Sequence, residues 1–323
     1  MEGKNPLVSI ITVNYNQAAV TNDLLASLNQ VVSPSFEVIV VDNGSKDNDY
    51  KRIDTSYPFA SLIISKVNLG FAGGNNLGVK AARGSFLLFL NNDTEVASDF
   101  LLPMIELFKK DKHVGAVSPK IRYFYQNDTI QYAGFSPMNR FTMRMHAIGF
   151  KEVDKGQHDQ VRETHFAHGC AMMVPREVLE KVGPMREEYF LYYEEHDWST
   201  RIRKAGYSIM FQPNALVLHK ESVAVEKDSP LKVHYLQRNR ILYMRRNIAG
   251  MAKLIPLIYL IAVSVPKNVL SYLLSGKRAY LSAYVQALRW HLTNLSLKHI
   301  EGPMPSYKAS SHTMKPGNQI SNK

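Results

Sequence analysis

Short apolar runs rich in β-branched and aromatic residues alternate with helix-periodic segments over the first ~120 residues. The pattern predicts strands at Leu7–Val13, Phe36–Val41, Ser61–Ile64, Ser85–Leu90 and Val114–Ser118. It predicts helices at Ala18–Asn29, Gly74–Ala82 and Ser98–Lys110. Such alternation is typical of an α/β fold in which helices cover both faces of a mainly parallel sheet.

Polar or glycine-rich loops follow four of the predicted strands. They read "NYN" (14–16), "DNGSKD" (42–47), "NLGFAGGNN" (68–76) and "NND" (91–93). One polar turn after a strand is common. Four at the carboxyl edge of one sheet, where ligands of such sheets bind, predict a ligand site.

The segment after residue 165 combines a further α/β pattern with acidic and aromatic residues. We predict a strand at Phe166–Val174 and a helix at Arg176–Lys181. The stretch "YFLYYEEHDWSTRIRKAGY" then enters a helix that ends at Gly206. Strands at Ser208–Phe211 and Ala215–Leu218 follow, and the second ends at His219.

The pattern changes at Leu231, where a basic helix is followed by two apolar helices with narrow polar stripes. This predicts an α/β domain over 1–230, a basic and amphipathic helical membrane-interface region over 231–300, and a disordered tail over 301–323. The apolar runs are shorter than the ~20 residues that span a bilayer, so we expect both helices to lie in the interface. The cations expected to face anionic lipid are Arg238, Arg240, Arg245, Arg246 and Lys253. A helical hairpin packed on the domain, or on a second copy of the chain in a homo-oligomer, remains the alternative.

The composition is that of a folded chain with a large core, with 45% hydrophobic and 21% charged residues. The net charge of +11 favours a polyanionic partner. Nucleic acid is disfavoured because the basic residues cluster beside apolar helices and not on a sheet with stacking aromatics. Cys170 is the only cysteine, so no intramolecular disulfide forms. The N-terminus lacks a signal-peptide pattern, so we expect a cytoplasmic protein that is peripheral on the inner face of the cell membrane.

Six motifs in order carry a family resemblance. They are "VSIITVNYN", "VDNGSKD", "NLGFAGGNNLG", "FLLFLNNDT", "YFLYYEEHDWSTRIRKAGY" and "ALVLH". Together they resemble the inverting family 2 glycosyltransferases of the GT-A fold, in the rhamnosyltransferase-like branch, over residues 6–246. The resemblance implies transfer of a sugar from a dTDP- or UDP-linked donor to a glycan or lipid-linked acceptor. Only the branch suggests dTDP-rhamnose.

The resemblance also implies a metal site. "Asn91-Asn92-Asp93" occupies the position of the family's Asp-x-Asp motif, which makes Asp93 a metal ligand and leaves Asn91 in place of the first acid. His219 matches the histidine that completes the metal or diphosphate site. Oxygen ligands suit Mg²⁺ or Mn²⁺, and either cation stabilises a diphosphate leaving group.

Donor contacts are assigned by the same resemblance to strand ends and loops. The residues are Val13, Asn14, Asp42, Asn68, Gly70, Asn75, Asn76, Asn91 and Asn92. Two positions depart from the family pattern: Asn75 stands where many members have Arg, and Lys220-Glu221-Ser222 replace the small residues that usually follow the histidine.

The catalytic base is expected in "Glu194-Glu195-His196-Asp197", where the second acid of the family's acidic pair maps to Glu195. Asp197 lies four residues before Arg201, a spacing suited to an intrahelical ion pair. Glu194 and Tyr193 are expected beside the base or at the acceptor. The alternative function is a non-catalytic nucleotide or polyanion binder, a degenerate transferase that organises a membrane complex.

Overall fold

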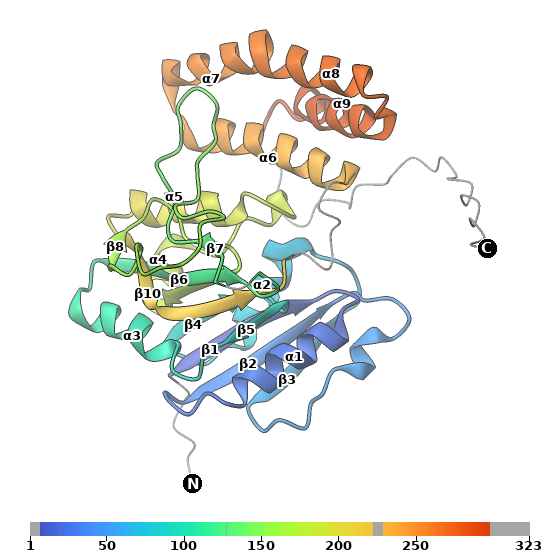
Figure 1. The fold of residues 1–323 in the computed structure, drawn as a ribbon. Coiled ribbons are helices and arrows are strands. Elements are labelled where there is room, and N and C mark those ends of the chain that lie inside the picture. The colour runs from blue at the N-terminus through green and yellow to red at the C-terminus, as the bar shows by residue number, and fades with distance from the viewer. Residues whose placement is uncertain (1–6, 127, 222–228, 298–323) are drawn as a thin grey trace, which may run out of the picture.

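The computed structural model describes residues 7–126, 128–221 and 229–297 of the 323-residue chain. The described chain forms an α/β body with a separate layer of helices against it (Figure 1). The tail predicted for residues 301–323 lies outside the described residues.

The central sheet runs in the order β3-β2-β1-β4-β9-β6-β10-β5, with β7 paired to β6 and β8 to β10 (Figure 1). Its strands are β1 (Val8–Asn14), β2 (Phe36–Asn43), β3 (Ala60–Ser65), β4 (Phe86–Leu90), β5 (Thr94–Val96), β6 (Val114–Tyr123), β7 (Ile130–Tyr132), β8 (Arg162–Glu163), β9 (Ala171–Pro175) and β10 (Ser208–His219). Strands β1 to β4 are parallel, whereas β9 runs antiparallel to β4 and β6. The predicted α/β fold is confirmed, and the part of the sheet beyond β4 contains both parallel and antiparallel strand pairs.

Helices cover both faces of the sheet, as predicted. Helices α1 (Ala18–Leu28) and α3 (Leu101–Lys110) pack on one apolar core. Helices α2 (Gly70–Ala81), α4 (Arg176–Val182) and α5 (Glu194–Lys204) pack on the other. The short 3₁₀ helices η1 (Asp49–Arg52) and η2 (Glu187–Tyr189) lie in the connecting loops.

Several predicted elements differ in their bounds: β6 extends to Tyr123, α3 begins at Leu101, and the two strands predicted between Ser208 and Leu218 form the single strand β10. Helix α2 begins one turn earlier than predicted, at Gly70, whose φ of +74° and close approach to the Phe190 carbonyl leave no room for a Cβ. Strand β9 begins only at Ala171, because residues 166–170 turn away from the sheet and the Asn91 amide donates to the Cys170 carbonyl (2.8 Å). That turn brings new side chains to the carboxyl edge of the sheet.

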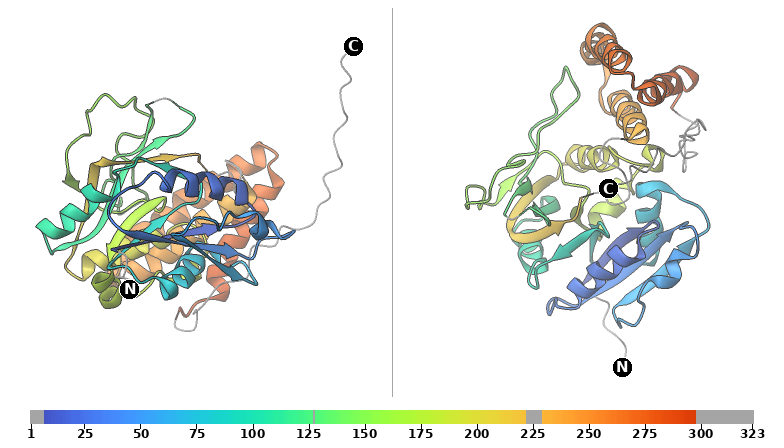
Figure 2. Two further views of the ribbon diagram at one scale, coloured as in Figure 1. Left: turned by 90° about the horizontal axis from the view of Figure 1, so that it is seen from below. Right: turned by 45° about the vertical axis from the view of Figure 1, so that its right-hand side comes forward.

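The C-terminal helices form a separate layer, in which α6 lies next to the α/β body and the later helices lie outside α6 (Figures 1 and 2). They are α6 (Pro230–Asn247), the continuous helical stretch Gly250–Leu274, and α9 (Arg278–Thr293). The stretch Gly250–Leu274 comprises η3 (Gly250–Lys253), α7 (Leu254–Tyr259), the π-helical turn η4 (Leu260–Ser264) and α8 (Val265–Leu274). By length and composition this stretch alone, among the described residues, could cross a membrane.

The expectation that the α6 arginines face lipid is wrong. Arg238 and Arg240 are only 2% and 6% exposed. Arg238 donates to the Glu188 and Tyr189 carbonyls, and Arg246 forms an ion pair with the Glu188 carboxylate. Arg245 donates to carbonyls just beyond α9. These cations face inward because η2 and the end of α9 offer them acceptors, which repays the cost of burying charge.

Candidate active site

A cavity of about 580 Å³ opens at the carboxyl ends of β1 to β4, where the four polar loops were predicted to meet. This volume lies within the range of small-molecule sites. The predicted residues that line it are Val13, Asn68, Gly70, Asn75, Asn91, Asn92, Asp93, Glu194, Glu195 and His219. The fold therefore brings most of the predicted site together.

Other predicted residues lie behind the cavity wall. Asn14 and Asp42 are fully buried, and the Asn14 amide donates to the Asp42 carboxylate at 2.9 Å. Asn76 donates to the Met185 carbonyl and Tyr193 to the Met143 carbonyl, so both side chains are directed at protein partners. In this structure these four side chains therefore have protein partners, and their predicted roles at the donor or beside the acceptor stay predictions.

Asp93 and His219 face each other in the cavity, with 3.1 Å between Asp93 Oδ1 and His219 Nε2. Strand register explains the meeting, because His219 at the end of β10 pairs with Thr94 of β5. Gln131 on β7 lies 2.7 Å from His219 Nδ1 and orients the ring. Burial opposes the charged ring, but Cys170 and Asp93 outweigh it and raise the pKa of His219 well above its usual range.

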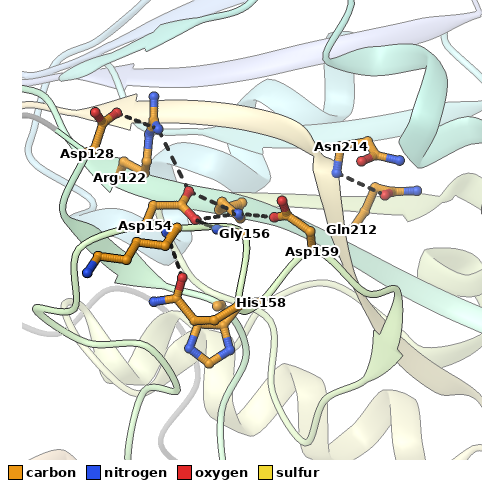
Figure 3. Close-up of polar contacts among 12 residues, drawn as sticks. Arg122, Asp128, Asp154, Gly156, His158, Asp159, Gln212 and Asn214 are labelled. Carbon is orange, nitrogen blue, oxygen red and sulfur yellow. Dashed lines mark hydrogen bonds and ion pairs between the residues drawn. The ribbon is translucent and has the colours of Figure 1, made fainter.

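A salt-bridge network supports the segment that carries Gln131 (Figure 3). Arg122 on β6 forms an ion pair with Asp128, and buried Lys120 forms ion pairs with Asp154 and Asp159. The network ties residues 128–159 to the strand beside β10. It thereby holds β7 where Gln131 can reach His219.

The residues present fit a divalent cation. A carboxylate and an imidazole meet in the cavity, and the described lining residues include no Lys or Arg while four are acidic: Asp93, Glu194, Glu195 and Glu221. No group of three His, Cys, Asp or Glu side chains suited to a metal occurs among the described residues. A cation held by Asp93 and His219 would therefore keep positions for phosphate oxygens or water, as Mg²⁺ and Mn²⁺ commonly do.

Glu194 and Glu195 stand at the first turn of α5, on the side of the cavity formed by that helix. Burial raises the pKa of Glu195 to about 7. Burial and the neighbouring Glu195 raise the pKa of Glu194 well above its usual range. His196 lies 3.2 Å from Glu195 but is neutral, since burial lowers its pKa to about 3. Glu194 therefore retains its proton more strongly, and Glu195 titrates near neutral pH.

Asp197 does not line the cavity and instead anchors α5. Its fully buried carboxylate accepts from Arg186 (3.0 Å), Arg201 (2.9 Å), Tyr189 (3.2 Å) and Asn247 (2.8 Å). The predicted ion pair with Arg201 is confirmed. With its charge matched in this way, Asp197 holds the helix that carries Glu195.

Several lining residues were missed by sequence reasoning. They are Tyr15, Gln17, Asn43, Phe71, Leu90, Gln131, His168, Gly169, Cys170, Phe190, Leu191, Tyr192, Glu221, Ser229 and Leu231. Tyr15, Asn43 and Phe71 lie within predicted loops but were given no role, and Gln17 directly follows the first loop. Gln131 and His168 carry no local signal, because β7 and the turn at 166–170 reach the site only through tertiary packing.

Comparison with known proteins decides the family. The model of Glycosyl transferase family 2 matches residues 9–183, more than half of the chain. The chain belongs to glycosyl transferase family 2. It is therefore a glycosyltransferase.

Relatives of this glycosyltransferase act in glycan assembly. It is 27% identical over 240 residues to the low-salt glycan biosynthesis hexosyltransferase of Haloferax volcanii, covering 73% of this chain and 74% of the relative. It is 24% identical over 257 residues to the N-acetylglucosaminyl-diphospho-decaprenol L-rhamnosyltransferase of Mycobacterium tuberculosis, covering 71% and 81%.

Solved structures share its fold. The mannosyltransferase of Pyrobaculum calidifontis, in complex with GDP-Man and Mn²⁺, matches with a TM-score of 0.54 and 18% identity over 91% of this chain and 77% of the other. GalNAc-T7 with UDP, GalNAc and Mn²⁺ matches with a TM-score of 0.56 and 16% identity over 82% and 57%. These likenesses confirm the GT-A fold of the glycosyltransferase.

Proposed function

We propose that this glycosyltransferase performs metal-assisted inverting transfer of a sugar, rhamnose from dTDP-rhamnose or a sugar from a UDP-linked donor, to a lipid-linked or growing glycan acceptor. One observation carries the proposal: the Asp93–His219 pair and the Glu194–Glu195 pair line the same cavity, which contains no described Lys or Arg. A diphosphate entering this acidic cavity needs a cation to offset its charge.

The metal pair defines the leaving-group side of the site. Asp93 and His219 would hold Mg²⁺ or Mn²⁺, which stabilises the negative charge that develops on the departing nucleoside diphosphate. The cation would replace the direct contact between Asp93 Oδ1 and His219 Nε2. Asn91 and Asn92, which also line the cavity, offer amides to the donor without adding repulsion.

Glu195 defines the attacking side. Its carboxylate would accept the proton of the acceptor hydroxyl as that oxygen bonds to the anomeric carbon and the diphosphate leaves from the opposite face. A pKa of about 7 suits a base near neutral pH, because the ionised fraction and the basicity are both substantial. Displacement from opposite faces inverts the configuration of that carbon.

The acceptor class is supported by a relative and by the C-terminal helices. The Mycobacterium tuberculosis relative is named for a lipid-diphosphate acceptor. In this chain the stretch Gly250–Leu274 keeps apolar side chains exposed, including Ile258 (63%) and Ile261 (62%). A membrane surface would cover them and present a lipid-linked acceptor, which supports a peripheral position at the cell membrane.

A donor screen tests the proposal. Purified protein with Mn²⁺ and a panel of dTDP-, UDP- and GDP-sugars is expected to release nucleoside diphosphate when a lipid-diphosphate sugar acceptor is added. Asp93→Asn keeps the shape of the side chain but removes its charge, and it should lower turnover roughly 100-fold or more. Full activity of that variant would refute the metal assignment.

The alternative of a non-catalytic binder makes a different prediction for Glu195→Gln. In an enzyme, turnover is lost while donor binding persists, because the base acts on the acceptor. In a binder, neither donor binding nor any other measured property changes. Glu180→Gln, the same substitution at an exposed carboxylate on α4, is the matched control and should leave both quantities unchanged.

A further inference from the structure

His168 is a cavity residue with no role in the proposed chemistry so far. It lies in the turn before β9, and its ring stacks on Phe135 with 5.7 Å between centroids and 6° between planes. Tyr132 packs edge-on against the same ring at 5.1 Å. The backbone amide of His168 donates to the Ser118 hydroxyl at 3.1 Å. The ring therefore has one orientation, set by contacts on several sides.

The hydrogen bonds of His168 determine which ring nitrogen carries the proton. Nδ1 accepts the backbone N–H of Cys170 at 3.1 Å, so the proton of the neutral ring is on Nε2. Burial, with the nearby His219 and His196, lowers the pKa of His168 to about 3, so the ring stays neutral. Among the described residues no hydrogen bond to Nε2 is present. The cavity thus contains a fixed, uncharged N–H donor.

The turn that carries His168 lies between the two reacting sides of the cavity. Its neighbour Gly169 adjoins Glu195, since a Cβ built on Gly169 would be 3.5 Å from the Glu195 carboxyl carbon. On the other side, Cys170 contacts His219. In an inverting displacement the transferred sugar lies between the leaving diphosphate and the attacking hydroxyl, and therefore between His219 and Glu195.

We infer that His168 Nε2–H donates a hydrogen bond to a hydroxyl of the sugar being transferred and helps to select that sugar. The inference rests on the proposed function, because it uses the same cavity. A neutral donor suits a hydroxyl, whereas a phosphate would favour a cation. A sugar without an oxygen at the matching position would leave the buried donor unpaired and bind more weakly.

The test compares His168→Gln with His168→Asn. The terminal amide of Gln can reach the position of Nε2, whereas the shorter Asn matches Nδ1 and retains only the acceptor for Cys170 N–H. The probes are the nucleotide-sugar selected by the donor screen and its own nucleoside diphosphate, each titrated with Mn²⁺ by calorimetry. His168→Asn should weaken the nucleotide-sugar about tenfold and leave the nucleoside diphosphate unchanged. His168→Gln should restore most of the lost affinity.

Other outcomes overturn the inference. Equal weakening of the nucleotide-sugar and the nucleoside diphosphate by His168→Asn would assign His168 a structural role. Unchanged donor affinity with a raised acceptor KM would move the hydrogen bond to the acceptor and also refute the inference. If the wild-type protein bound no nucleotide-sugar, the proposed function would fail together with it. If the wild-type protein binds the nucleotide-sugar and His168→Asn binds it equally well, only the His168 inference fails.

Discussion

At the residue scale, two neighbouring glutamates differ in how strongly they hold a proton because their surroundings differ. Glu194 and Glu195 are adjacent on α5, yet Glu194 is only 3% exposed and retains its proton more strongly. One outer oxygen of each carboxyl has no hydrogen-bond partner among the described residues. A buried carboxyl group with an unpaired oxygen destabilises the fold when it ionises. The presence of two such groups in one cavity therefore favours a functional role for them.

The pH dependence of turnover follows from Glu195. A base must be ionised, and burial raises the pKa of Glu195 to about 7. We expect kcat/KM at saturating Mn²⁺ to fall about tenfold per pH unit below ~7 and to level off above it. Steady-state assays from about pH 5.5 to about pH 8.5 measure this, with donor affinity as the control. A flat profile would exclude Glu195 as the base.

The stability of the fold should respond to Glu194 in the opposite sense. Because the pKa of Glu194 is raised in the folded state, its favourable contribution is present below its unfolded pKa and is lost as pH rises through the folded value. Glu194→Gln should therefore raise Tm by about 2 °C or more at ~pH 8, with little effect at ~pH 4.5. Thermal unfolding at both pH values tests this, and Glu180→Gln on exposed α4 surface is the control. A lower Tm at both values would contradict the assignment.

Asn91 leaves the metal motif one carboxylate short. Asn91→Asp adds a hard, charged oxygen to a residue that already lines the cavity beside Asp93. We expect Mn²⁺ to bind about tenfold more tightly, as measured by calorimetry with and without nucleoside diphosphate. Asn75→Asp is the control, because Asn75 lines the same cavity from α2 and its amide donates to the Phe71 carbonyl at 2.9 Å. Equal tightening by both variants would indicate a general charge effect.

At the element scale, α6 holds the turn that leads into α5, which carries the proposed base Glu195. Phe190, Tyr192 and Tyr193 have positive φ values of 63°, 70° and 77°, a conformation that side chains other than glycine adopt at a cost. The fully buried Asn239 amide donates to the Tyr189, Leu191 and Tyr192 carbonyls at 2.7–2.8 Å. Helix α6 thus sets the position at which Glu194 and Glu195 begin α5.

Removing the hydrogen bonds of Asn239 should lower kcat by more than the loss of stability alone would. Asn239→Leu removes the side-chain donor of the Leu191 and Tyr192 carbonyls, whereas the Tyr189 carbonyl still accepts from Arg238. We expect about 3 kcal/mol or more of destabilisation and at least a tenfold fall in kcat in the remaining folded protein. Asn268→Leu on α8, which loses hydrogen bonds to Ser264 and Tyr284, is the control. Urea unfolding and kcat are measured on both. Equal kcat values would argue against positioning by Asn239.

At the scale of the whole molecule, the outermost helical layer is polar toward the protein and apolar outward. Arg240 donates to the Ser264 hydroxyl, which ties η4 to α6, and the Asn268 amide donates to the Tyr284 hydroxyl, which ties α8 to α9. The exposed apolar residues of Gly250–Leu274 include Met251, Leu254, Ile255, Leu257, Ile258, Ile261, Val263, Leu270, Leu273 and Leu274. A helix lying in the membrane interface keeps these internal bonds, whereas a spanning helix would break them.

Membrane binding is tested by charging this face. Ile258→Glu/Ile261→Glu should reduce cosedimentation with phosphatidylglycerol vesicles at least tenfold, because two carboxylates oppose both acyl burial and anionic headgroups. Val32→Glu/Val161→Glu makes the same charge change at exposed sites on the α/β body and should bind as the wild type does. Dimerisation of the wild type without vesicle binding would instead assign this face to a second copy of the chain.

The sequence alone determined the α/β fold and the polar loops at four strand ends, because strand periodicity and strand-end residues are local properties. The family resemblance, which also lies in the sequence, predicted the roles of Asp93, His219 and Glu195. Tertiary structure decided the rest. It turned the α6 arginines inward by supplying carbonyl acceptors from η2, and it placed Gln131 and His168 in the cavity through strand pairing. It also withdrew Asn14 and Asp42 behind the wall. A residue's distance along the chain carries no information about which polar partner will reach it, so burial and pairing of these side chains could be read only from the folded chain.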